Sequence, residues 1–189
     1  MFNIGTNQHY LTAYLQDQLG FRPTESTTSA LINLVHNVTL MFESNSYVRC
    51  LLIYFSKASD VVRHALVLAK LSTLGILSAI LNWIVGLPFL TGSTQATKAA
   101  NGTFSGLLSI TQSIIQGSGI GPTLWIIMES DLHLISEVNV LVKYADDTNL
   151  HVPENTNVSL ADEFTHIKEW AVKNCININF DKTKEVVFH

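Results

Sequence analysis

The spacing of apolar residues along the chain predicts a mixture of helices and strands. Within residues 28–42, apolar side chains recur at intervals of three and four positions, which indicates a helix. Residues 48–55 form a continuous run of apolar and β-branched side chains, which is typical of a central strand buried on both faces. Two further helices are predicted over residues 61–74 and 76–87, and Pro88 ends the second one.

The second half of the chain predicts two hairpins separated by a helix. Residues 91–112 are rich in Thr, Ser and Gly, and Asn101-Gly102 is a strong turn signal between short strands. Pro122 suits the first turn of a helix that is predicted to continue to Ile135. The remaining predicted elements are a strand over residues 138–144, a returning strand over 148–152, a helix over 160–174 and a strand pair flanking 181–182.

This order of elements indicates an α+β fold in which an antiparallel sheet packs on helices. The 189 residues, 47% hydrophobic and 14% charged, allow one folded domain with a sizeable core. The net charge of −4 and the pI of about 5.9 are a poor match for a protein that grips a phosphate backbone unaided. Either nucleic acid is not the partner, or the basic surfaces lie outside this chain.

Cysteine use and the N-terminal residues favour an intracellular protein, in the nucleus or the cytoplasm. Cys50 and Cys175 are expected to be reduced core residues, and no signal-peptide pattern points to secretion. Residues 71–97 contain no charged residue and no histidine, and part of this stretch is long enough to cross a bilayer. Polar residues and glycines dilute its apolarity, so two buried helices joined near Gly75 explain it better. A small membrane protein remains an alternative.

Two adjacent carboxylates, Asp146 and Asp147, stand at the turn between the strands of the second hairpin. Like charges this close repel each other unless a cation neutralises them, and hard divalent cations prefer carboxylate oxygens. Two such cations clamp the attacking and leaving oxygens in phosphoryl transfer. A solvated surface turn also contains this dipeptide, so the interpretation depends on the motifs around it.

Those motifs resemble reverse transcriptases, in the right order across nearly the whole chain. Residues 144–147, Tyr-Ala-Asp-Asp, resemble the signature hairpin of the family. Residues 116–122, Gln-Gly-Ser-Gly-Ile-Gly-Pro, resemble the motif before its long palm helix, and residues 20–27 resemble the fingers–palm junction. Residues 170–184 resemble the module after the catalytic hairpin. The amino-acid sequences of the motifs are most similar to those of non-LTR (LINE-like) retrotransposons. The chain is identified as a truncated copy of the reverse-transcriptase domain of such an element.

The resemblance implies a reverse-transcriptase palm over residues 46–189 and partial fingers, with the fingers–palm junction, over residues 1–45; a thumb is not expected. Its palm motifs would be residues 51–60, 116–122, 144–147 and 170–184. It also implies an RNA-directed DNA polymerase that works by two-metal nucleotidyl transfer, with Mg²⁺ or Mn²⁺ as the cofactor. The implied partners are an RNA template, a DNA primer and a dNTP, and no stable protein partner is expected.

The resemblance further assigns roles to single residues. Asp146 and Asp147 would act in catalysis and hold the metal. The residues implied to contact the nucleotide or the template are Ser59, Gln116, Gly117 and Lys182.

One departure from the family pattern puts the activity in doubt, because Tyr54 occupies the position of the first catalytic aspartate. A neutral phenol supplies one weakly coordinating oxygen and no charge. Asp60, further along the same motif, is expected to face away from the hairpin. We therefore expect weakened metal binding and an inactive chain, because transition-state charge would go unmatched. The alternative function is that of an inert or weakly nucleic-acid-binding retroelement remnant.

Overall fold

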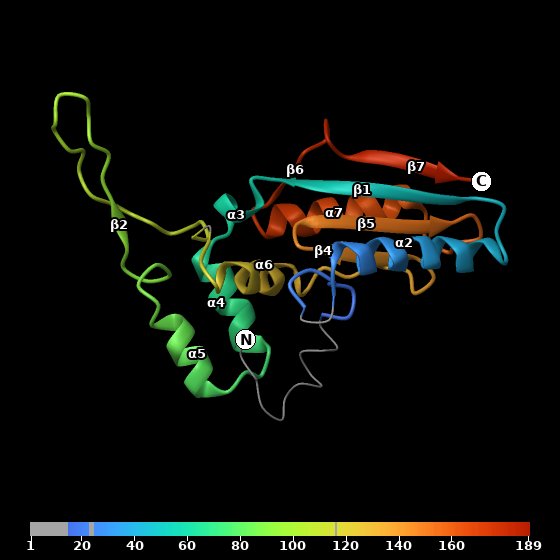
Figure 1. The fold of residues 1–189 in the computed structure, drawn as a ribbon, viewed down its shortest axis with the longest axis horizontal. Helices are drawn as coiled ribbons and strands as arrows, with labels where there is room; N and C mark the ends of the chain where they lie inside the picture. The colour runs from blue at the N-terminus through green and yellow to red at the C-terminus, as the bar shows by residue number, and fades with distance from the viewer. Residues whose placement is uncertain (1–14, 23–24, 116) are drawn as a thin grey trace.

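Figure 1 shows a computed structural model of the chain, which describes residues 15–22, 25–115 and 117–189. The elements in chain order are α2 (Thr27–Phe42), β1 (Val48–Ser56), α3 (Ala58–Val61), α4 (His64–Thr73), α5 (Ser78–Val85), β2 (Thr94–Gln95), β3 (Leu108–Ser109), α6 (Gly121–Glu129), β4 (Val140–Tyr144), β5 (Asp147–Pro153), α7 (Leu160–Lys173), β6 (Asn177–Ile178) and β7 (Lys184–Phe188).

Most of these elements confirm the predicted ones to within a few residues. α2 begins where Ser26 caps it, since the Ser26 hydroxyl accepts a hydrogen bond from the Ser29 backbone N–H and the Ser29 side chain bonds back. The predicted hairpin around Asn101-Gly102 is present as β2 and β3, and it projects away from the sheet in Figure 1. α7 begins at a similar cap, Ser159.

A five-stranded sheet with β1 at its centre organises the molecule. β5 pairs antiparallel with one edge of β1, and β4 pairs with the outer edge of β5. β6 and β7 pair antiparallel with successive stretches of the other β1 edge. The two final strands flank residues 181–182 as predicted, although each pairs with β1 and not with the other. The predicted α+β architecture is therefore confirmed.

Side chains of β1 alternate between two hydrophobic clusters, which lie on opposite faces of the sheet. Leu51, Ile53 and Phe55 pack against residues of α4, α6 and α7. Val48 and Cys50 pack against α2 on the other face, and Figure 1 shows α2 and α7 running alongside the sheet. This two-sided cover explains the continuous apolar run of the strand.

The uncharged stretch at residues 71–97 contains no long helix. α4 ends at Thr73, Gly75 adopts a left-handed backbone with a φ of 61°, and α5 begins at Ser78. Among the described residues, none belongs to a helix long and apolar enough to cross a membrane. The two helices confirm the interpretation of a broken stretch, although α5 is less buried than predicted, since Trp83 is 48% exposed.

α6 is shorter than predicted and ends at Glu129. The last carbonyl groups of a helix have no partner within it, and lysines often satisfy them. Here Lys70 Nζ donates to Met128 O at 2.5 Å and Lys143 Nζ donates to Glu129 O at 3.1 Å. Both lysines come from other elements, so the residues of the helix itself do not indicate where it ends.

Candidate active site

The two carboxylates lie at a tight turn between β4 and β5. Tyr144 and Asp147 are Cα partners in the antiparallel ladder, so Ala145 and Asp146 form a two-residue turn. Ala145 has a φ of 56°, the left-handed backbone that such turns require. Asp147 opens β5 and is exposed, while Asp146 at the tip is half-buried.

Tyr54 lies directly beside this turn on the neighbouring strand. It is the Cα partner of Asp147 in the β1–β5 ladder. Directly opposed residues in antiparallel strands place their side chains on the same face, a few ångströms apart. The phenol of Tyr54 therefore lies on the same face of the sheet as the carboxylate of Asp147.

The two carboxylates of the turn repel each other, and the described residues bring no third carboxylate, histidine or cysteine to them. Partial burial, and then the charge of Asp146, raise the pKa of Asp147 above its usual range. Within the described part of the chain, no group of three or more His, Cys, Asp or Glu side chains is placed to hold a metal ion. The residues present therefore do not fit a two-metal centre.

Lys182 packs against Tyr54. Its ammonium nitrogen lies 4.4 Å from the centroid of the Tyr54 ring, within the range of a cation–π interaction. The loop that carries it is tied to β1, because Asn179 N–H donates to Tyr54 O at 2.8 Å and the Tyr54 N–H donates to Thr183 Oγ1 at 3.3 Å. The aromatic ring thus serves as the contact surface for the one basic side chain predicted at the site.

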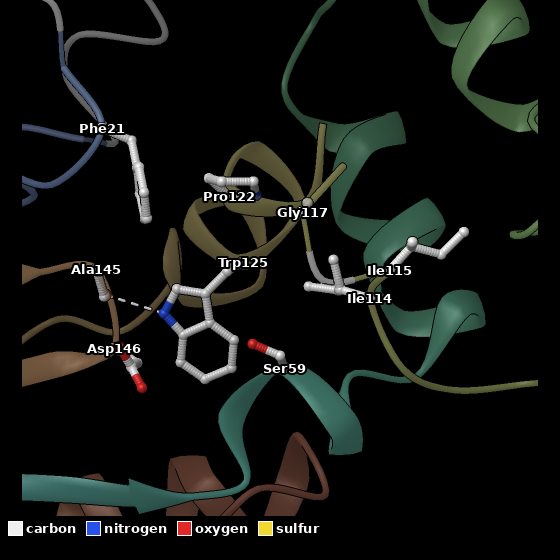
Figure 2. Close-up of a pocket in the computed structure, with 10 residues that line it drawn as sticks. Phe21, Ser59, Ile114, Ile115, Gly117, Pro122, Trp125, Ala145 and Asp146 are labelled. Atoms are coloured by element: carbon white, nitrogen blue, oxygen red, sulfur yellow. Dashed lines mark hydrogen bonds between the residues drawn. The ribbon is translucent and has the colours of Figure 1, made fainter. Parts of the chain in front are cut away.

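A cavity of about 200 Å³ opens next to the turn, and Figure 2 shows the residues around it. Three of the residues singled out by the sequence line it together: Ser59, Gly117 and Asp146. Gly117 has a φ of 79°, a backbone that favours glycine. The lining of this cavity does not include Tyr54, Asp147 or Lys182. Gln116 lies outside the described residues.

Sequence reasoning missed Trp125, which forms a wall of this cavity. Figure 2 shows its indole between Asp146 and Ser59, and its Nε1–H donates to Ala145 O at 2.9 Å. Trp125 is 4% exposed and sits in an apolar helix, where the sequence pattern indicates only a core residue.

Asp60 takes no part in the acidic site, as expected. It lies in α3 and lines a different cavity, of about 630 Å³, together with residues of the β2–β3 hairpin. It therefore does not replace the carboxylate that is absent at Tyr54.

A buried polar network behind the turn was also missed. Lys143, 1% exposed, forms an ion pair with Asp17 at 2.8 Å. Gln18, 2% exposed, donates from Nε2 to Glu129 Oε2 at 3.3 Å. Burial raises the pKa of Glu129 to about 8, against the lowering effect of Lys143. The sequence does carry one signal of this network, because Lys143 and Glu129 each stand inside an apolar segment. A buried charge needs a partner, so two such residues indicate a buried polar network.

The central sheet, the acidic turn between two of its strands and the adjoining cavity define the palm of a nucleic-acid polymerase. The chain matches the family described as "Reverse transcriptase (RNA-dependent DNA polymerase)" over residues 5–187, and it belongs to this family.

A curated relative agrees with this assignment. The chain is 27% identical over 197 residues to the RNA-directed DNA polymerase from mobile element jockey of Drosophila funebris. This match covers 97% of the chain and 21% of the relative, so the chain spans about a fifth of that protein's length. Together with the family match, it confirms the prediction of a reverse-transcriptase domain from a non-LTR retrotransposon.

Solved structures share the fold at low sequence identity. Apo telomerase from Candida tropicalis, truncated from its C-terminal domain, superposes with a TM-score of 0.68 at 13% identity, covering 97% of this chain and 39% of that one. Telomerase from the same organism in complex with a TWJ fragment of telomeric RNA gives a TM-score of 0.69 at 11% identity, covering 96% and 32%. These likenesses confirm the palm fold.

Proposed function

We propose that this chain is a retrotransposon reverse-transcriptase palm whose own two-metal nucleotidyl transfer is lost at Tyr54. The observation that carries the proposal is the register of β1 and β5, which sets Tyr54 opposite Asp147. Members of this family use divalent metal ions, and the transfer needs carboxylates that converge on them. Here a phenol stands opposite Asp147, at the position where the family places the first carboxylate.

The surroundings of the turn support retained contacts with nucleic acid or nucleotide. Ser59 and Gly117 line the same cavity as Asp146 and Ala145 of the turn. We propose these two residues, together with Gln116 and Lys182, as the nucleotide- and template-contacting set. An RNA template, a DNA primer and a dNTP are the proposed ligands, with Mg²⁺ or Mn²⁺ as the metal of an intact family member.

The division of the chain is part of the same proposal. Residues 46–189 would be the palm, with motifs at 51–60, 116–122, 144–147 and 170–184, and residues 1–45 would belong to the fingers and their junction. The central strand supports this division, because β1 and the acidic hairpin both fall inside the proposed palm.

Primer extension tests the proposed loss of activity. The unaltered chain, given Mg²⁺, an RNA template, a DNA primer and dNTPs, should incorporate no more nucleotide than the variant Asp146→Asn/Asp147→Asn. Loss of one metal-ligand carboxylate removes several orders of magnitude of rate, so both proteins should stay at background. Incorporation by the unaltered chain clearly above that control would contradict the proposal.

A further inference from the structure

Gln18 is the side chain that contacts the acidic turn from behind. Its Oε1 accepts a hydrogen bond from Ala145 N–H at 3.0 Å, and its Nε2 donates to Ala145 O at 3.2 Å. A single buried amide thus holds both backbone polar groups of the residue that begins the turn. Trp125 is a second donor to the same carbonyl, at 2.9 Å.

Ala145 needs such partners because of its backbone conformation. A non-glycine residue with a φ of 56° is held in a sparsely populated region, and surrounding contacts must fix it there. Ala145 lies between the paired residues Tyr144 and Asp147, where the β4–β5 ladder ends. Ala145 therefore has no ladder partner among the described residues, and Gln18 supplies hydrogen bonds to its backbone instead.

The segment that carries Gln18 is fastened to β4. Lys143 N–H donates to Asp17 O at 2.6 Å, and Leu19 N–H donates to Lys143 O at 2.7 Å. Gln18 and Lys143 therefore form a parallel β-bridge. A Cβ added to Gly20 would lie 2.2 Å from Ala145 N, closer than real atoms approach. The segment therefore packs against the turn at a distance that only glycine permits.

Glu129 supports Gln18 from the core. It is 1% exposed and accepts from Gln18 Nε2 at 3.3 Å, while Thr148 Oγ1 lies 3.5 Å from its other oxygen. Gln18 Oε1 also accepts from Gly20 N–H at 2.7 Å, which fixes the amide orientation. The contacts with Glu129 and Gly20 thus fix the rotamer in which the Gln18 amide meets Ala145.

We propose that Gln18 is a positioning residue for the acidic turn: it holds Ala145 so that Asp146 faces the cavity and Asp147 stays opposite Tyr54. This inference deepens the proposed function. It depends on that function only for the interpretation of the acidic turn as part of a metal site. It also implies that the frame of the metal site persists in this chain although one ligand has been replaced.

Amide hydrogen exchange tests the proposal in the chain without any change at Tyr54. Gln18→Met keeps the length of the side chain and removes its hydrogen bonds. The Ala145 amide should then exchange about tenfold faster or more by NMR, while ladder amides of β1 and β5 keep their rates. The matched control is Thr148→Val, which also removes a buried contact to Glu129 but touches no atom of Ala145 in the hydrogen-bond network; it should leave the Ala145 rate unchanged.

A second variant reaches the same contact by a different route. Gly20→Ala should push the segment away from Ala145 N and give the same local acceleration of exchange. An unchanged Ala145 rate in Gln18→Met, or an equal acceleration in Thr148→Val, would overturn the positioning role. So would loss of the folded state in both Gln18→Met and Gly20→Ala with Thr148→Val folded, because the segment would then serve folding in general.

A metal readout separates this inference from the proposed function. In a Tyr54→Asp chain, adding Gln18→Met should weaken Mn²⁺ binding about tenfold, whereas adding Thr148→Val should not. Failure of Tyr54→Asp to bind Mn²⁺ would count against the proposed function. The exchange rate of Ala145 would still decide the role of Gln18.

Discussion

At the scale of single residues, Glu129 is a buried carboxyl group whose pKa is strongly shifted. Its carboxyl is buried behind the acidic turn, and burial raises its pKa to about 8. The folded chain therefore binds a proton there that the unfolded chain has already released at neutral pH. Since the folded pKa is raised, this contribution to stability is present at low pH and is lost as the pH rises towards 8.

His151 acts in the opposite direction over a lower pH range. Its ring is fully buried, and burial lowers its pKa to about 4. A lowered histidine pKa makes the folded state bind fewer protons than the unfolded one, so stability rises with pH until about 6.5. The two effects oppose each other below that pH, and Glu129 continues to lower stability between about 6.5 and 8, above the range of His151.

The resulting prediction is a fall in the free energy of unfolding between about pH 6.5 and 8, with a slope of up to about 1.4 kcal/mol per pH unit. Glu129→Gln keeps the shape of the side chain and should remove this fall. Urea unfolding at a series of pH values measures it. A slope that is the same in the variant and the unaltered chain would show that Glu129 does not titrate as described.

At the scale of elements, the sequence predicts what is local and misses what is assembled from distant parts. α2, β1 and the hairpin of β4 and β5 were predictable because periodicity and turn chemistry act over a few residues. The pairing of β6 and β7 with β1, and of Gln18 with Lys143, was not, because short irregular segments carry no periodic signal. The end of α6 was missed because the lysines that bind its last carbonyls come from other elements.

The ion pair that supports this end of α6 gives a prediction at the same scale. Lys143→Met should lower the free energy of unfolding by about 3–5 kcal/mol, because it leaves Asp17 and the carbonyl of Leu132 without their buried donor. Lys182→Met is the matched control: it removes an exposed lysine and its contact with Tyr54, and it should cost about 1 kcal/mol or less. Equal losses in urea unfolding would contradict this assignment.

At the scale of the whole molecule, three distant segments converge on one small region. β1 brings Tyr54, the β4–β5 hairpin brings the two aspartates, and the segment at residues 17–20 supports the turn from behind. The motifs predict that Tyr54 occupies the position of a catalytic carboxylate, and the sheet register adds that it is the partner of Asp147 in the ladder. The net charge of −4 leaves the chain without the basic balance that is usual for proteins that bind a phosphate backbone unaided.

A titration with Mn²⁺ tests the central claim, that Tyr54 prevents this palm from holding its metal ions. The loss of the free-ion signal in electron paramagnetic resonance reports binding to the unaltered chain, to Tyr54→Asp and to Tyr54→Asn, which matches aspartate in size without its charge. Tyr54→Asp should bind more than about tenfold tighter than the unaltered chain, since it completes a three-carboxylate site, and Tyr54→Asn should gain nothing. An unaltered chain that binds Mn²⁺ as tightly as Tyr54→Asp would contradict the account.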